Sequence, residues 1–244
     1  MSFESVKAAI AAVARGELVV VADDRDRENE GDLIFAASAA TPEKLAFMVH
    51  HTSGIVCVAA RASRLEALEL PLMVPQNNES YQTAFTVSVD YRHGTSTGIS
   101  ASDRSATVRA LAESATRPQD LARPGHVFPL RAREGGVLAR GGHTEAACDL
   151  AELAGLPPLG ALAEIVNPDG SMARRPELVR FAEHHGLVYT TIHELICYRR
   201  ALLQRESTRD AVVRANASVA LRAVQQHALL LRDQQAASQQ GCEL

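Results

Sequence analysis

Short runs of β-branched and aliphatic residues alternate with longer stretches of helical character along most of this chain. Residues 18–22 (LVVVA) and 55–59 (IVCVA) have the length and composition of buried strands. Residues 5–14 carry apolar side chains at helical spacing and end before a glycine, and Thr41-Pro42-Glu43 is typical of a helix start. Because such elements alternate without an internal repeat, the sequence predicts an α/β or α+β architecture with a mixed sheet.

The same signals place the remaining elements. Further strands are predicted at residues 33–37, 85–90, 127–130, 161–166 and 187–190. Further helices are predicted from a capping Ser102 to Leu111, from Thr144 to Ala154, and from Pro176 to His185, which Gly186 follows. A capping box at Thr191–Glu194 predicts one more helix start.

Length, charge and composition exclude several classes of protein. The 244 residues suit one domain with an appendage, and a hydrophobic share of 46% excludes disorder of the whole chain. A formal net charge of −4, no tryptophan and 4% aromatic residues argue against a nucleic-acid partner. No apolar run approaches the ~18–20 residues of a membrane span, and the first residues lack the order of a signal peptide. We therefore expect a cytoplasmic protein with no membrane partner.

The cysteines are widely separated and form no CxxC pair. They are Cys57, Cys148, Cys197 and Cys242. This spacing supports neither a zinc knuckle nor a disulfide framework. We interpret each cysteine as a buried, small apolar residue.

An acidic segment between two predicted strands is the first of three polar clusters. Residues 23–32 (DDRDRENEGD) hold six carboxylates and two arginines. An EF-hand loop starting at Asp24 is excluded, because Asn29 would take the glycine position and Phe35 the position of the bidentate glutamate. A solvated turn and a magnesium site that uses one or two of the carboxylates both remain open.

Residues 92–104 (RHGTSTGISASDR) form the second cluster. Its glycines and hydroxyl residues supply donors that can hold a phosphate, but it lacks the GK[ST] ending of a nucleotide-binding P-loop. A plain surface loop is the alternative for this segment.

The third cluster has two histidines, His126 and His143, on either side of a predicted strand and a glycine turn. Gly141-Gly142 leads directly into a predicted helix, whose free N–H groups and dipole can receive an anion. Arg140 adds a charged fork for the same anion. Structural histidines are the alternative interpretation.

In this order, the segments DDRDRENEGD, SGIVC, TSTGISASDR, RPGHVFPLRA, RGGHTEA and AEIVNPDGSMAR resemble the 3,4-dihydroxy-2-butanone 4-phosphate synthase family. The resemblance runs from about residue 5 to residue 200. It implies an α+β fold with a mixed β-sheet sandwiched by helices, in a homodimer with its active sites at or near the subunit interface. It also implies a lyase of riboflavin biosynthesis. Such an enzyme uses Mg²⁺ or Mn²⁺ to convert D-ribulose 5-phosphate to L-3,4-dihydroxy-2-butanone 4-phosphate and formate.

The resemblance also assigns roles to individual residues. It implies Glu28 and His143 as metal ligands. The implied catalytic set is His126, Glu164, Asp32 and Cys57, of which Cys57 matches a position that lines the site. The implied substrate-binding set is Arg27, Glu28, Asp32, Thr97, Arg140, Gly141, Gly142, His143, Thr144 and Glu164. These residue types suit the chemistry, because each enolisation needs a base beside a carbonyl and an electrophile for the enolate oxygen.

Some features depart from the family or extend beyond it. Position 25 is arginine, where many members carry an acid, and nothing supplies the cysteine zinc cluster of a GTP cyclohydrolase II domain. We therefore expect a monofunctional catalytic domain over residues 1–200 and a helical tail over residues 201–244. Two alternatives stay open: a paralogue that acts on another sugar phosphate, and a catalytically silent binding protein. The presence of Glu28, His126 and His143 argues against the second.

Overall fold

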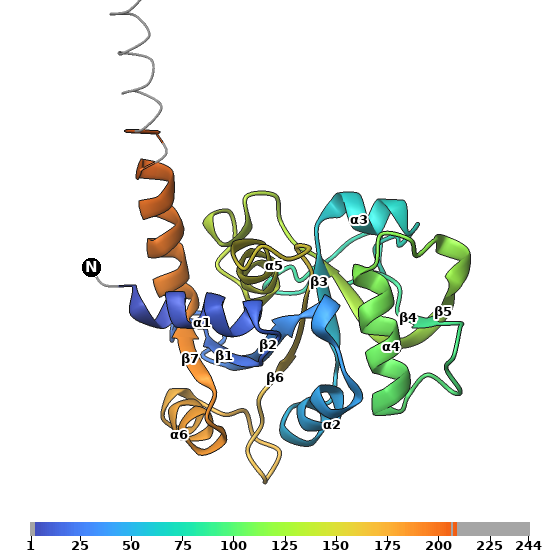
Figure 1. The fold of residues 1–244 in the computed structure, drawn as a ribbon, viewed down its shortest axis with the longest axis horizontal. Helices are drawn as coiled ribbons and strands as arrows, with labels where there is room; N and C mark the ends of the chain where they lie inside the picture. Colours follow the sequence, from blue (N-terminus) through green and yellow to red (C-terminus); the bar gives the residue numbers. More distant parts are fainter. Residues whose placement is uncertain (1–2, 206, 209–244) are drawn as a thin grey trace, which may run out of the picture. The chain divides into compact units, whose positions relative to one another are not determined.

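A seven-stranded mixed sheet organises the protein (Figure 1). The computed structural model describes residues 3–205, 207 and 208. The strands lie in the order β4 (Val89–Tyr91), β5 (Leu121–Arg131), β3 (Cys57–Ala60), β6 (Gly160–Glu164), β2 (Gly31–Ala36), β1 (Val19–Ala22) and β7 (Val188–Thr191). The pairs β3–β5 and β1–β7 are parallel, and the other pairs are antiparallel. The predicted α+β architecture with a mixed sheet is confirmed.

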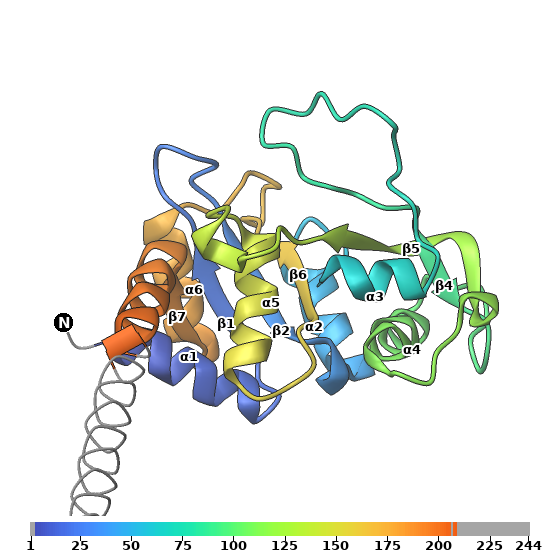
Figure 2. The ribbon, with the colours of Figure 1, turned by 90° about the horizontal axis from the view of Figure 1, so that it is seen from above.

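Helices cover both faces of this sheet (Figures 1 and 2). On one face lie α1 (Glu4–Ala14) and α5 (His143–Leu153). On the other lie α2 (Pro42–His51), α3 (Ala62–Ala67), α4 (Ala101–Ala112) and α6 (Arg175–His185). Short 3₁₀ turns occur at Ala37–Ala39, Pro118–Asp120 and Gly136–Leu138. The protein therefore has two hydrophobic cores, one on each face of the sheet.

Alternation along the central strands decides which side chains reach the α5 face. In β2, Leu33 and Phe35 pack on the α2 face, whereas Ile34 packs on the α5 face. Because successive side chains point to opposite faces, Asp32 shares the α5 face with Ile34. Asp32 pairs with Glu164 of β6, so two carboxylates meet where the apolar part of this face ends.

The predicted helix starts agree with the structure to within one residue except at α4, and the short helix α3 was not predicted. The Thr41 hydroxyl accepts a hydrogen bond from the Lys44 amide at 3.3 Å, as predicted for a capping residue. At α4 the cap is Ser100, whose hydroxyl accepts from the Asp103 amide at 3.0 Å, and the predicted cap Ser102 lies inside the first turn. The prediction was wrong there because both serines have capping chemistry, and only the chain path distinguishes them.

Two strand predictions differ from the structure. The predicted strand at residues 85–90 survives only as β4, with isolated bridges from Phe85 to Leu130 and from Thr86 to Leu72. The segment before it, between α3 and β4, forms a long loop (Figure 2), and its Tyr81 hydrogen-bonds to Arg27 and Arg140. The strand predicted at residues 127–130 begins earlier, at Leu121, because it pairs with β4 across Pro124 and Gly125.

The chain up to Tyr198 forms one unit, and a second unit begins at Arg199. Residues 199–205 are helical. The predicted tail at residues 201–244 lies almost entirely outside the described residues. Within the described part of the chain, no helix is both long and apolar enough to cross a membrane.

Candidate active site

The acidic segment folds around the buried carboxylate of Asp23. Its Oδ2 accepts hydrogen bonds from the Glu28 amide and from Arg27 Nη1, each at 3.0 Å, and its Oδ1 accepts from the Glu30 amide at 2.9 Å. The Asp23 side chain is 0% exposed. The segment is therefore an ordered loop, not a solvated turn, and Asp23 shapes it.

His143 is the first residue of α5 and is nearly buried. Its Nε2 lies 3.1 Å from the Val21 carbonyl oxygen, which can only accept a hydrogen bond. Its Nδ1 lies 3.6 Å from Glu28 Oε2 and 3.6 Å from Asp32 Oδ1. Such a bond to a backbone carbonyl is the usual arrangement for a metal-binding histidine, because it fixes the ring and directs the other nitrogen at the ligand.

The carboxylates around His143 shift its proton affinity. Burial alone would lower the pKa of His143, but the carboxylates of Asp32, Glu28 and Asp23 raise it to about 9. Burial raises the pKa of Asp32 to about 8, and Glu164, Glu28 and Glu30 add to this rise. Acidic groups crowded into a buried space favour any added positive charge, whether a proton or a cation.

The donor set fits a divalent cation. Asp23, Glu28 and His143 each offer one ligand atom, and these atoms lie within 4.8 Å of one another. Asp32 Oδ1 is buried without a hydrogen-bond partner in the described chain. Carboxylate oxygens with one imidazole suit Mg²⁺ and Mn²⁺. Because Asp23 already accepts three hydrogen bonds within the loop, Glu28 and His143 are the better placed ligands.

Glu28 is held in its charged form. Burial tends to raise the pKa of Glu28, but hydrogen bonding and charge from His143 and Arg27 bring it below the usual value. Arg27 Nη1 lies 2.6 Å from Glu28 Oε2. The predicted residue Arg27 thus joins the same group and links Glu28 to Asp23.

Glu164 completes the cluster from β6. Its Oε2 accepts from the Ser53 hydroxyl at 2.7 Å, and its backbone oxygen accepts from the Ser53 amide at 2.8 Å. Sequence reasoning missed Ser53, together with Asp23 and Glu30, as contributors to this site. Burial and the charge of Glu28 raise the pKa of Glu30. Both acids lie inside the acidic motif, so the signal for them was present, whereas Ser53 carries none before the fold is known.

Cys57 lies in β3, opposite Leu162 of β6, and is 4% exposed. Burial and the nearby carboxylates of Glu164 and Asp32 raise the pKa of the thiol well above its ordinary value. A neutral thiol is a poor nucleophile. Cys57 therefore borders the carboxylate cluster as a small neutral group.

His126 and Thr97 lie apart from this cluster. His126 is on β5, separated from Glu164 of β6 by strand β3, so the two strands are about 10 Å apart. Its Nδ1 lies 2.7 Å from Asp90 Oδ2. Thr97 is exposed beside Gly98, which packs against His126. Within the described residues, no hydrogen bond or ion pair joins His126 to Glu28, Asp32 or His143.

The hydroxyl-rich loop before α4 uses its donors internally. Asp103 Oδ2 accepts from the Ser96 hydroxyl at 2.8 Å and from the Gly98 amide at 3.0 Å. A carboxylate of the chain itself thus accepts the donors that would otherwise be available to a phosphate. Of the two interpretations of residues 92–104, the structure favours the plain loop.

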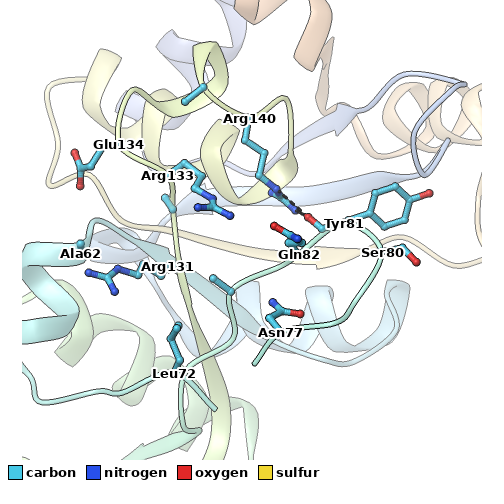
Figure 3. A pocket seen from close by; sticks show the side chains of 13 residues that line it. Ala62, Leu72, Asn77, Ser80, Tyr81, Gln82, Arg131, Arg133, Glu134 and Arg140 are labelled. Atoms are coloured by element: carbon cyan, nitrogen blue, oxygen red, sulfur yellow. Dashed lines mark hydrogen bonds between the residues drawn. The ribbon is translucent and has the colours of Figure 1, made fainter. Parts of the chain in front are cut away.

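The predicted anion turn at Arg140–Thr144 is ordered around a buried acid. Arg140 Nη1 lies 2.7 Å from Glu145 Oε2, and Arg140 Nη2 donates to the Tyr81 carbonyl at 3.1 Å. A side chain at Gly142 would come within 2.2 Å of Arg140 Nη1, so the close approach needs glycine. Arg140 also lines a cavity of about 940 Å³, together with Arg131, Arg133 and Tyr81 (Figure 3).

Comparison with known proteins agrees with these observations. The 3,4-dihydroxy-2-butanone 4-phosphate synthase family model matches residues 7–198. An Agrobacterium fabrum protein of that name is 55% identical over 212 residues, which cover 87% of this chain and 100% of that protein. A Pectobacterium atrosepticum protein of the same name is 52% identical over 204 residues, covering 84% of this chain and 94% of its own.

A solved structure of an enzyme of this name, in complex with two magnesium ions, superposes with a TM-score of 0.78 at 46% identity. The superposition covers 80% of this chain and 96% of that one. Sequence, fold and site geometry thus agree, and the chain belongs to the 3,4-dihydroxy-2-butanone 4-phosphate synthase family.

Proposed function

We propose that the protein converts D-ribulose 5-phosphate to L-3,4-dihydroxy-2-butanone 4-phosphate and formate, as a lyase of riboflavin biosynthesis. Family membership supports the reaction. The observation that carries the proposal is the close approach of two carboxylates to one imidazole nitrogen. His143 Nδ1 lies 3.6 Å from Glu28 Oε2 and 3.6 Å from Asp32 Oδ1. A catalytically silent relative would have no need for so costly a cluster of buried acids.

Glu28 and His143 are the residues that would hold Mg²⁺ or Mn²⁺. A divalent cation, when bound, stabilises negative charge on adjacent substrate oxygens as a Lewis acid. The related enzyme solved with two magnesium ions supports a divalent cation in this family. Asp23 contributes by fixing the loop that carries Glu28.

Proton transfer falls to Asp32, Glu164 and His126. With its pKa raised to about 8, Asp32 can both take and return a proton near neutral pH. Glu164 lies across the β2–β6 register from Asp32, so the two carboxylates act on one region of substrate. Cys57, as a neutral thiol, lines the same region.

Arg140, Gly141, Gly142 and Thr144 would bind the substrate phosphate. The first amides of α5 have no acceptor within the helix, so together with the favourable end of the helix dipole they can bind an anion. Glu145 holds the Arg140 guanidinium in place, so the fork is positioned before substrate arrives. Phosphate oxygens would take the bonds that Arg140 now gives to the Tyr81 carbonyl. Arg27 and Thr97 would contact the rest of the sugar phosphate.

The active protein would be a homodimer. Ile55 and Ile99 expose 49% and 51% of their surface, and both lie in segments that pack beside His126. Exposed aliphatic side chains next to a functional histidine suit a subunit interface. A second subunit would cover them and shield His126 from water.

The test is direct. The purified protein is incubated with D-ribulose 5-phosphate and Mg²⁺, Mn²⁺ or excess chelator, and formate release and the four-carbon product are followed by enzyme assay and NMR. We expect formate with either metal and none with chelator. Formate release from another sugar phosphate, but not from ribulose 5-phosphate, would favour the paralogue and overturn the proposal.

A further inference from the structure

Both carboxylate oxygens of Asp90 interact with a single residue, His126. Asp90 Oδ1 accepts from the His126 amide at 2.9 Å, and Asp90 Oδ2 lies 2.7 Å from His126 Nδ1. Asp90 lies on β4, and its side chain is 12% exposed, whereas the His126 side chain is 43% exposed. The carboxylate therefore forms the buried wall behind a ring whose other nitrogen faces outward.

The backbone closes tightly over this pair. A Cβ at Gly98 would come within 2.1 Å of Asp90 Oδ2 and 2.8 Å of His126 Nδ1, and a Cβ at Gly125 would meet the Val89–Asp90 peptide at about 2 Å. On a third side, the buried Arg104 interacts with the charge of Asp90 and donates to the Gly54 carbonyl at 3.1 Å. The Asp90 side chain thus has one orientation, and it imposes that orientation on the ring.

The contact also selects where the imidazole carries its proton. A carboxylate offers only acceptor oxygens, so the Nδ1 of a neutral His126 must carry the hydrogen. The Nε2 then presents a lone pair on the exposed side, and no side chain of the described residues hydrogen-bonds to it. An oriented imidazole with a free Nε2 is the arrangement of a general base supported by an acid.

We propose that Asp90 is the positioning residue for His126: it fixes the ring and its tautomer so that Nε2 takes and returns the substrate proton. This rests on the proposed function, in which His126 moves a proton. Asp90 lies outside every polar cluster of the sequence and 36 residues from its partner, so no local pattern marks it.

Asp90→Asn tests the tautomer without removing volume. If the side-chain oxygen of the introduced asparagine keeps the hydrogen bond from the His126 backbone N–H, its NH₂ group must face His126 Nδ1. Nδ1 must then accept that hydrogen bond, so the ring hydrogen moves to Nε2. We expect kcat for ribulose 5-phosphate to fall by about 10²–10⁴-fold, the usual contribution of a positioned acid or base, with KM and Mn²⁺ affinity within about twofold. Asp90→Glu keeps an acceptor and should recover part of kcat.

Two comparisons make the result specific. Asp120→Asn is the matched control, because Asp120 makes a similar contact with His93 at 3.0 Å on the exposed surface, and its kcat should stay unchanged. The double variant Asp90→Asn with His126→Gln should be no slower than His126→Gln alone, since a residue that acts through another adds nothing once that one is gone.

Nitrogen-15 NMR of labelled histidine reads the tautomer directly and does not depend on activity. We expect a protonated Nδ1 in the unaltered protein and a protonated Nε2 in Asp90→Asn. An unchanged tautomer, or wild-type kcat in Asp90→Asn beside an inactive His126→Gln, would overturn the inference alone. Full activity of His126→Gln would overturn both the inference and the role of His126 in the proposed function. No formate from the unaltered protein would overturn the proposed function, while the NMR result still decides the tautomer.

Discussion

The two histidines of the candidate active site are held by opposite ring nitrogens. His143 binds a backbone carbonyl through Nε2 and turns Nδ1 toward carboxylates, in a position that is 6% exposed. His126 binds a carboxylate through Nδ1 and leaves Nε2 on an exposed side. The same side chain is thereby prepared for different work. A ring that faces buried acids is suited to hold a cation, and a ring oriented by one carboxylate with its Nε2 unbonded is suited to exchange protons.

The difference follows from where each histidine sits in the fold. His143 begins α5 directly above the strands that carry Asp32 and Glu164, so acids surround it. His126 lies in β5, two strands away, where Asp90 is the single acid in hydrogen-bond contact. Each histidine follows a glycine in a similar GH motif, so the local sequence does not distinguish them. The difference in their surroundings comes from their places in the sheet order.

Glu28→Gln should have the largest effect on activity. It should disturb the metal site at His143 and leave the Asp90–His126 contact unchanged. The variant loses a charged metal ligand, so Mn²⁺ affinity should fall together with formate release. We expect a loss of at least about 10³-fold in kcat/KM, since metal ions supply several kcal/mol of charge stabilisation.

Asp26→Asn serves as the matched control for Glu28→Gln, because Asp26 is an exposed acid in the same loop. Its kcat/KM should stay within about twofold of the unaltered value. A Glu28→Gln protein that keeps full activity at low Mg²⁺ would remove Glu28 from the ligand set.

Arg140→Ala should have a smaller effect on kcat/KM and should leave the surroundings of both histidines unchanged. Removing a charge-assisted hydrogen bond to phosphate costs about 1.5–3 kcal/mol, so kcat/KM for ribulose 5-phosphate should fall about tenfold to a few hundredfold. Manganese affinity should not change. Arg131→Ala is the control, since Arg131 lines the same cavity but pairs with the exposed Glu66. Equal kcat/KM in Arg140→Ala and the unaltered protein would place the phosphate elsewhere.

The last prediction concerns the stability of the metal-free protein. It tests whether His143 and Asp32 titrate together as their positions imply. In the metal-free protein, His143 and Asp32 have folded pKa values of about 9 and about 8, each above its ordinary value. The folded state therefore binds more protons than the unfolded state, and the free energy of unfolding must fall as pH rises from about 4 to 9. We expect a fall of several kcal/mol, since one unit of pKa shift corresponds to about 1.4 kcal/mol.

Denaturant titrations in excess chelator at several pH values measure this slope. Asp32→Asn should flatten it, because the amide does not titrate and no longer pairs with the His143 cation. Saturating Mn²⁺ should reverse it, since bound metal replaces the proton on His143. Stability that rises with pH in chelator would show that the two groups are not coupled as the structure places them.

Local patterns were enough to predict much of the fold and to bring part of the candidate site together. The run at residues 18–22 and the cap at Thr41 depend on near neighbours, and they appear where predicted. Glu28 and Asp32 lie in one motif, and β1–β2 pairing folds that motif back on itself. Such features need little tertiary information.

Long-range features could not be predicted. The bonds from Asp90 to His126 and from Ser53 to Glu164 join segments far apart in sequence, and nothing local marks Asp90 or Ser53 as special. The hydroxyl-rich loop resembled a phosphate site because its donors and Asp103 were both visible in the sequence, but nothing in the sequence showed that Asp103 accepts from those donors. Which partner satisfies a polar group is decided by packing.

Manganese titration followed by electron paramagnetic resonance, on His143→Gln and His126→Gln side by side, tests the division of labour most directly. The account predicts that His143→Gln loses Mn²⁺ affinity by at least about a hundredfold, together with formate release. It predicts that His126→Gln binds Mn²⁺ within about twofold of the unaltered protein although its kcat falls by about 10²–10⁴-fold. Unchanged Mn²⁺ affinity in His143→Gln, or lost affinity in His126→Gln, would contradict it.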